Sequence, residues 1–398
     1  MHSDATSRTT GTQDFSLVLG GPLYQLLRRS HLADDHLLLQ RRRIVVITTI
    51  AWLPLFLLTA TSGTLIGGVP TPFLMDVEPH TRFLLAMPLL IAAELTVHER
   101  MRLVASTFRA RELIPASAGD RLEVAIASAY RWRNSIIAEV ALLAFVYVVG
   151  VQFVWRDYLS LSTATWYSTP NGAGGSTLTL PGAWYVYVSL PAFQFLLIRW
   201  YFRMVIWARL LWQVSRIELQ LVPTHPDRVG GLGFLSNTVY AFVPLIVAHG
   251  VLLAGVLANQ IFHAGARLTE FHLEILLLVI VLMVMVVGPL ATFAPQLAGA
   301  KRKALREYGN FAQRYVRAFD GKWLRGDEPE EAMLGSGDIQ SLADLANAFG
   351  VIKEMRLVPA SKEAIVQLAV IALAPMLPLL LTLMPLDELL KKLIGIVF

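Results

Sequence analysis

Three ionisable residues lie inside long apolar runs of this 398-residue chain, where a polar side chain is costly and needs a reason to be present. They are Glu94, Glu139 and His249. A carboxylate and a histidine at membrane depth could pass a proton or a cation along a polar path. Alternatively, the two glutamates could pair with Arg199 or Arg203 and fix how helices pack. Both interpretations stay open for the glutamates, while His249 is expected to have a functional role or to face the interior of a helix bundle.

A second group of reactive side chains lies in the stretch LVPTHPDRVGGLGFL, residues 221–235, between two apolar runs. Its prolines and glycines predict a tight connector, because proline ends a helix and glycine adopts positive backbone dihedrals. The glycine amides, beside a cationic side chain, could instead bind a phosphate, a lipid headgroup or another anion. The candidate residues for this anion site are His225, Asp227, Arg228, Gly230 and Gly231.

The composition indicates the kind of protein that holds these residues. The chain is 55% hydrophobic and 16% charged, whereas soluble domains carry about 25% charged residues. It contains no cysteine, which excludes thiolate catalysis, zinc-thiolate sites and iron–sulfur clusters. The sequence also lacks the usual phosphate-binding, zinc-protease and hydrolase signatures, so we expect no cofactor and no metal site. An enzyme is therefore less favoured than a non-catalytic membrane protein.

Apolar stretches long enough to cross a bilayer, about 20 helical residues each, predict an all-α polytopic integral membrane protein with about seven transmembrane helices. The predicted spans are residues 44–65, 83–97, 136–155, 183–200, 239–262, 273–295 and 365–386. The first 40 residues lack the features of a cleavable signal peptide, so we expect the first span to remain in the membrane.

The distribution of Lys and Arg predicts how these spans are oriented. Of the 34 basic residues, all but five lie in the N-terminal segment and the loops on the same side of the membrane. The exceptions are Arg82, Arg156, Arg267, Lys391 and Lys392. Since cytoplasmic loops keep an excess of Lys and Arg, the N-terminus is predicted to lie in the cytoplasm and the protein in a cell inner membrane. The net charge of +5 is then a topology signal, and we expect lipid rather than nucleic acid as partner.

The predicted spans and loops divide the chain into eight segments. They are a cytoplasmic segment 1–43, two spans in 44–98, a cytoplasmic helical loop 99–135, a third span, outer loop and long fourth span in 136–212, a connector 213–238, two spans in 239–295, a cytoplasmic helical segment 296–364, and a seventh span with an amphipathic tail in 365–398. The helix after Asp120 is expected to continue through Asn134 into the third span. Amphipathic stretches near 120–134, 301–319 and 338–352 predict a compact helical layer under the membrane, or contact with anionic lipid headgroups.

Three functions are compatible with this organisation. The leading hypothesis is a channel or secondary transporter for a small ion or solute, with its polar path near Glu94, Glu139 and His249. The second is a membrane-bound scaffold or signalling subunit whose cytoplasmic helices bind a soluble partner or another protomer of a homo-oligomer. The third is an enzyme that acts on a lipid-linked substrate at the membrane interface, with His225 and Asp227 as acid–base groups.

Overall fold

The computed structural model of the protein describes residues 15–32, 39–154, 164–170, 176–325 and 335–383. The predicted amphipathic tail, the last residues of the predicted seventh span and the first 14 residues lie outside these ranges.

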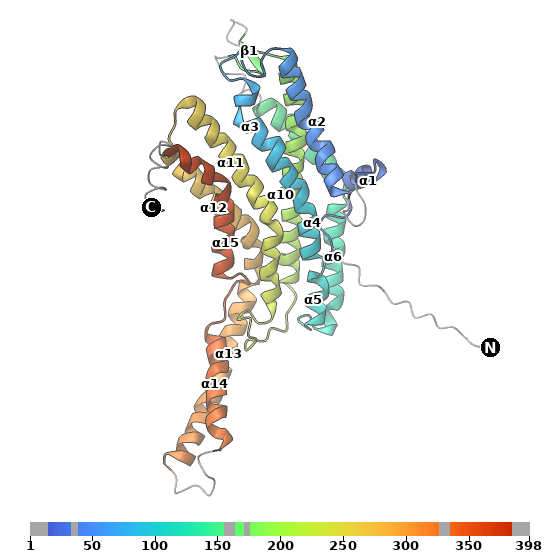
Figure 1. Cartoon of the computed structure of the whole chain (residues 1–398). Coiled ribbons are helices and arrows are strands. Elements are labelled where there is room, and N and C mark those ends of the chain that lie inside the picture. Colours follow the sequence, from blue (N-terminus) through green and yellow to red (C-terminus); the bar gives the residue numbers. More distant parts are fainter. Residues whose placement is uncertain (1–14, 33–38, 155–163, 171–175, 326–334, 384–398) are drawn as a thin grey trace, which may run out of the picture.

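The described chain is mostly helical (Figure 1). The longer helices of the bundle are α2 (Gln40–Thr61), α4 (Met87–Met101), α6 (Gly119–Arg133), α7 (Ile136–Phe145), α10 (Leu190–Val214), α11 (Val243–Ala264), α12 (His272–Val287) and α15 (Lys362–Leu373). Short helices are α1 (Pro22–Arg29), α3 (Val77–His80), α5 (Val104–Ala110) and α9 (Leu180–Trp184). Tighter or wider helical turns are η1 (Phe73–Met75), η2 (Thr81–Ala86), η3 (Ala116–Ala118), η4 (Val146–Val154), η5 (Tyr185–Ser189), η6 (Leu232–Phe242), η7 (Leu268–Phe271), η8 (Gly288–Phe293) and η9 (Ala374–Leu383). Strands β1 (Ser168–Pro170) and β2 (Ser176–Leu178) pair in an antiparallel register.

Within the described residues, six helices are long and apolar enough to cross a membrane, or up to seven if one bent pair counts as a single span. Helices suit this role because all their backbone hydrogen bonds are made inside one segment. The all-α prediction is therefore confirmed, and the chain has the pattern of a multi-pass membrane protein. A count of seven spans stays a prediction.

The bent pair consists of α6 and α7, which we expected to form one continuous helix. That expectation is wrong, since the two axes differ by 46° at the break. Ser135 has an extended backbone there, and its hydroxyl accepts the Ala138 N–H at 3.2 Å, so it caps a new helix. The break places Glu139 in the first turn of α7, beside the N-terminal segment of the chain.

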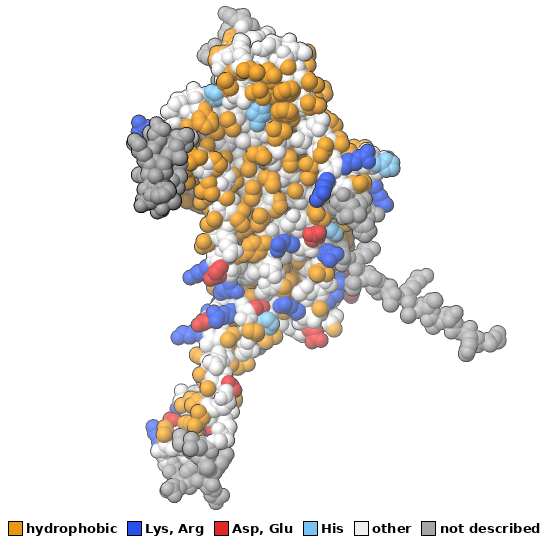
Figure 2. Space-filling view, viewed as in Figure 1, with side chains coloured by type: hydrophobic (Ala, Val, Ile, Leu, Met, Phe, Trp, Pro, Cys, Tyr) orange, Lys and Arg blue, Asp and Glu red, His pale blue; other side chains and the backbone are white. Residues whose placement is uncertain are grey.

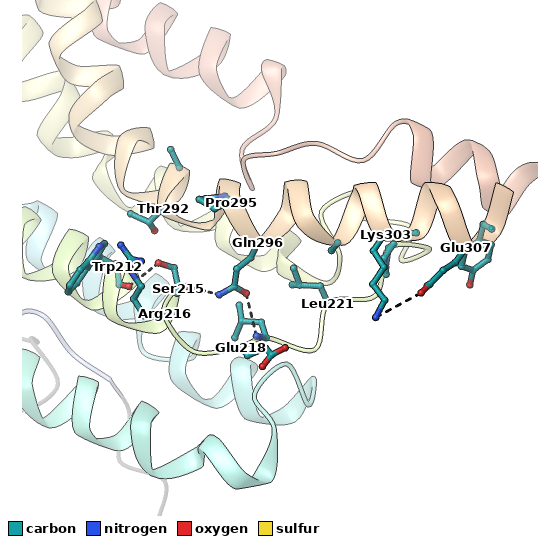
Figure 3. A pocket seen from close by; sticks show the side chains of 16 residues that line it. Trp212, Ser215, Arg216, Glu218, Leu221, Thr292, Pro295, Gln296, Lys303 and Glu307 are labelled. Carbon is teal, nitrogen blue, oxygen red and sulfur yellow. Dashed lines mark hydrogen bonds and ion pairs between the residues drawn. The ribbon is translucent and has the colours of Figure 1, made fainter. Parts of the chain in front are cut away.

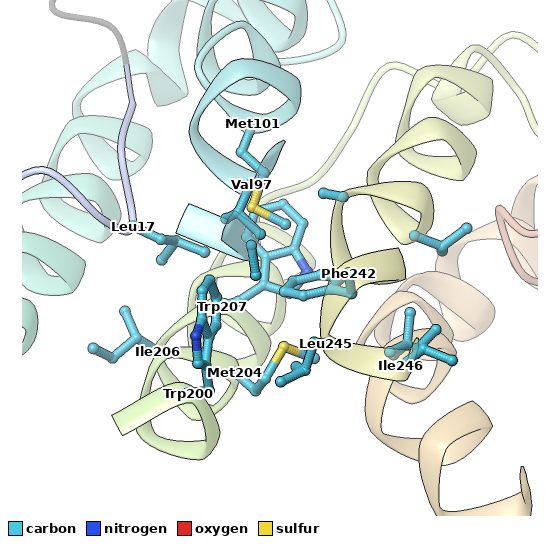
Figure 4. Packing of buried hydrophobic residues seen from close by; sticks show 14 of the residues in the cluster. Leu17, Val97, Met101, Trp200, Met204, Ile206, Trp207, Phe242, Leu245 and Ile246 are labelled. Carbon is cyan, nitrogen blue, oxygen red and sulfur yellow. The ribbon is translucent and has the colours of Figure 1, made fainter. Parts of the chain in front are cut away.

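The centre of the bundle is packed with large apolar side chains from α4, α10, η6 and α11 (Figure 4). Trp200 and Trp207 of α10 are fully buried, and Phe242 fills the space between them and α11. The Trp200 indole N–H donates to the Leu90 carbonyl of α4 at 2.8 Å, which satisfies its polar atom inside the core. This packing fixes α4, which carries Glu94, against α10, which carries two of the three buried arginines described below.

Two helices, α13 (Ala294–Trp323) and α14 (Gly337–Lys353), extend away from the bundle as a hairpin (Figure 1). The predicted compact layer is not confirmed for them, because they pair with each other beyond the end of the bundle. Asp338 at the start of α14 links the two helices at the far end of the hairpin. Its carboxylate accepts hydrogen bonds from Lys322 at 2.8 Å and from the Trp323 indole at 3.0 Å. The Lys322 partner lowers the pKa of this exposed carboxyl. The helical segment that begins at Leu268 runs to Trp323, so the hairpin continues a candidate span.

Candidate functional site

Glu94 of α4 is enclosed by three arginine side chains. Arg203 Nη1 lies 2.8 Å and Arg199 Nη1 3.4 Å from Glu94 Oε1, and Arg43 pairs with Oε2. Arg199 and Arg203 are four residues apart on α10 and so lie on one face, whereas Arg43 comes from the first turn of α2. The exposed fraction of each of these side chains is 7% or less. Charges buried this deeply persist only when they are paired.

Glu139 extends this network toward the N-terminus of the chain. Its Oε1 lies 3.1 Å from Arg199 Nη2, and its Oε2 accepts the Leu23 backbone N–H at 2.7 Å. That N–H belongs to the first turn of α1, so Glu139 satisfies a donor that the helix itself leaves open. We call Arg43, Glu94, Glu139, Arg199 and Arg203 the arginine cluster. It contains three cations and two carboxylates.

The cluster agrees with the ion-pair interpretation of the two glutamates, in which they pair with Arg199 or Arg203. The sequence reasoning missed Arg43. Arg43 is the last of three consecutive arginines, residues 41–43, directly before the first predicted span. Such a run ordinarily indicates only the orientation of the chain.

His249 of α11 lies apart from the cluster. The Leu245 carbonyl can only accept, so His249 Nδ1 donates to it at 2.7 Å. In the neutral imidazole, His249 Nε2 then accepts from the Tyr201 hydroxyl, also at 2.7 Å. Within the described part of the chain, no hydrogen bond or ion pair joins His249 to Glu94 or Glu139. The structure therefore does not bring the three predicted path residues together, although His249 does face the bundle interior as expected.

An apolar pocket of about 260 Å³ adjoins the arginine cluster. Its walls come from α1, α2, α4, η5 and α10, and they are formed by Leu23, Leu27, Ile47, Ile50, Ala51, Ile91, Val188, Ala192, Phe195 and Leu196. Its charged lining residues are Arg43, Glu94 and Arg199. Nothing in the sequence pattern marked this pocket, because its walls are ordinary apolar residues from helices that lie far apart in the sequence.

The glycine-rich turn after α10 is organised by one carboxylate. Asp227 Oδ1 accepts the backbone N–H of Val229 at 2.9 Å and of Gly231 at 3.2 Å, and Oδ2 accepts that of Gly233 at 2.8 Å. Burial would raise the pKa of Asp227, but the three N–H donors and nearby His225 outweigh it and lower that pKa. Gly230 and Gly231 both have positive φ values, 64° and 97°, which suits glycine at these positions.

Arg228 and two backbone carbonyls of the turn bind the segment that follows α14. Arg228 has a φ of 57°, and its guanidinium lies 2.9 Å from Glu354. The Arg356 side chain donates to the Asp227 carbonyl at 3.0 Å, and its backbone N–H donates to the Arg228 carbonyl at 2.7 Å. These contacts favour the connector interpretation over the anion site, because the carboxylate of Asp227 bonds the amides that an anion would need.

A wider groove of about 870 Å³ lies beside this turn, between the chain that leaves α10 and the start of α13 (Figure 3). Gln296 of α13 connects its two sides. Its amide nitrogen donates to the carbonyls of Ser215 at 2.5 Å and Ile217 at 2.7 Å, and its oxygen accepts the Leu219 N–H at 3.3 Å. The connector is thus tied to the base of the hairpin as well as to the segment after α14.

No protein-family model, no curated protein and no solved structure matches this chain. The features of the molecule that bear on its function are therefore the arginine cluster, the pocket beside it and the projecting hairpin.

Proposed function

We propose that the protein is a secondary transporter of a small solute, and that the pocket beside the arginine cluster is its substrate site. One observation carries this proposal: a pocket between candidate membrane-spanning helices has apolar walls and ends at buried charges. Pockets that combine apolar walls with a few convergent polar groups are typical ligand sites. An open polar channel has less support, because His249 lies outside the cluster.

The proposal includes an orientation, with the hairpin in the cytoplasm of a cell that has an inner membrane. Its support is the distribution of charge. On the face shown in Figure 2, hydrophobic side chains cover most of the bundle, whereas charged side chains gather toward the end from which α13 leaves. An excess of Lys and Arg is typical of the cytoplasmic side.

Labelling of a single introduced cysteine tests transport. The chain has no cysteine of its own, so Ala192→Cys in the pocket wall gives the only reactive thiol. A transporter exposes its site to each side of the membrane in turn. We therefore expect a membrane-impermeant maleimide to label this thiol both in right-side-out and in inside-out vesicles.

The matched control for this labelling is Val205→Cys, on the same helix but outside the pocket, where the native side chain is 53% exposed. It measures how fast the reagent reaches the outer surface of α10. Two results would rule out access from both sides: labelling of Ala192→Cys from one side only, or labelling no faster than that of Val205→Cys.

A second function, a membrane-bound docking subunit, is favoured by the projecting hairpin. Phe311 on α13 is 47% exposed, and Arg302, Arg306 and Arg317 lie exposed along the same helix. A photo-crosslinking amino acid at Phe311 is expected to give a product heavier than the protomer in cells. The control position is Val124 on α6, which is 63% exposed and outside the hairpin. Equal yields at the two positions would count against a docking surface on the hairpin.

A further inference from the structure

We propose that the pocket beside the arginine cluster takes a single-chain anionic amphiphile, an alkyl chain that ends in one carboxylate or phosphate monoester. This inference rests on the proposed function, because it names the substrate class of the same site.

The walls suit an alkyl chain. Ile47, Ile50 and Ala51 of α2 face the pocket from one side, and Ala192, Phe195 and Leu196 of α10 line it as well. The distance along α2 from Arg43 to Ala51 is about 12 Å at 1.5 Å per residue. An alkyl chain that runs along this length of α2 would contact apolar side chains of both helices.

The charged end suits one anion. Arg43, Arg199 and Glu94 line the pocket, and among the described residues their cluster has three guanidinium groups for two carboxylates. In a low-dielectric interior, an uncompensated cation is costly, and a ligand carboxylate or phosphate would balance it. Guanidinium groups also match the planar, bidentate geometry of these two anions. A cationic headgroup would add to the excess charge, and a neutral headgroup would leave it unchanged.

The size and position of the pocket favour a ligand with a single alkyl chain that enters from the lipid. At about 260 Å³ it lies slightly below the usual range for drug-sized ligands, roughly 300–1,000 Å³, and is small for a two-chain phospholipid. Arg41 and Arg42 at the start of α2 are exposed, which places the charged end of the pocket near the polar boundary of the membrane. Leu23 and Leu27 of α1 line the pocket beside this boundary.

Displacement of a fluorescent fatty acid tests the ligand class. The full chain, purified in a non-ionic detergent, is mixed with cis-parinaric acid, and competitors are added. Dodecanoate and dodecyl phosphate are expected to displace the probe, and displacement by just one of them would support the proposal and identify the headgroup. Dodecyltrimethylammonium, dodecanol and inorganic phosphate are expected to displace it at least tenfold less well. Equal displacement by dodecanol, by the cation or by inorganic phosphate would overturn the proposal.

Two variants locate the binding. Ala192→Phe fills the pocket and is expected to weaken binding of the probe at least tenfold, whereas Val205→Phe, on the same helix outside the pocket, is expected to leave it unchanged. Arg43→Gln is expected to weaken binding of the probe, and Arg43→Lys to restore part of it. If Ala192→Phe binds the probe as tightly as the unmodified chain, the pocket is not the site.

The binding and labelling experiments fail in different ways. Amphiphile binding together with one-sided labelling of Ala192→Cys would reject transport and keep the ligand. Two-sided labelling without amphiphile binding would reject the ligand class and keep transport.

Discussion

Glu94→Gln is expected to lower the free energy of unfolding by about 3–5 kcal/mol, because it removes the carboxylate shared by three buried guanidinium groups. Glutamine keeps the size of the side chain and one oxygen acceptor, so the change tests charge rather than packing. Arg43, Arg199 and Arg203 would then have Glu139 as the only carboxylate of the cluster. Uncompensated charge in a low-dielectric interior accounts for the size of the expected loss.

The measurement is denaturant unfolding of each variant in the same detergent. The matched control is Glu123→Gln, which breaks a pair with Arg109 whose side chains are 39% and 58% exposed, and we expect it to change stability by at most about 1 kcal/mol. A double variant, Glu94→Gln with Arg43→Gln, is expected to be more stable than Glu94→Gln alone, since it removes one of the excess cations. Equal stability of Glu94→Gln and Glu123→Gln would show that the cluster does not depend on ionised Glu94.

The helices of the bundle were predictable because membrane helices leave a local signal, a long apolar run. The break at Ser135 was not predicted, although the contact that caps α7, between the Ser135 hydroxyl and the Ala138 N–H, spans only three residues. The predicted third span begins at residue 136, directly after the break, but the sequence pattern on either side of the break does not fix the angle between the two helices. The sequence also indicated helices near 301–319 and from Asp338. Whether their apolar stripes meet the bundle or each other depends on contacts between distant segments, so the hairpin was not foreseen.

The candidate site depends mainly on contacts between residues far apart in the sequence. Arg199 and Arg203 were named as partners of the glutamates although they lie 105 and 109 residues from Glu94, whereas Arg43, 51 residues from Glu94, was not named. Tyr201, the partner of His249, is likewise 48 residues away. By contrast, all three backbone donors to Asp227 lie within six residues of it, so this turn was accessible to sequence reasoning.

Asp227→Asn is expected to lower the free energy of unfolding by about 2–3 kcal/mol at neutral pH. The asparagine oxygen can still accept the N–H groups of Val229 and Gly231. Its amide nitrogen, however, would face the Gly233 N–H across the 2.8 Å now spanned by Oδ2. A charge-assisted hydrogen bond is thus replaced by two opposed donors. The turn, which Arg356 links to the segment after α14, loses one of the hydrogen bonds that stabilise it.

The pH dependence of this loss follows from the lowered pKa of Asp227. A carboxyl whose pKa is lower in the folded than in the unfolded state contributes stability above the unfolded value, and loses it as pH falls through the folded value. The difference between Asp227→Asn and the unmodified chain should therefore not shrink between pH 8 and pH 5, and should shrink only below the ordinary value of 3.8. Asp344→Asn, on exposed α14, is the control and is expected to be nearly neutral. A difference that halves by pH 6 would contradict the lowered pKa. Stabilisation of the unmodified chain by inorganic phosphate, lost in Asp227→Asn, would favour the anion site over the connector.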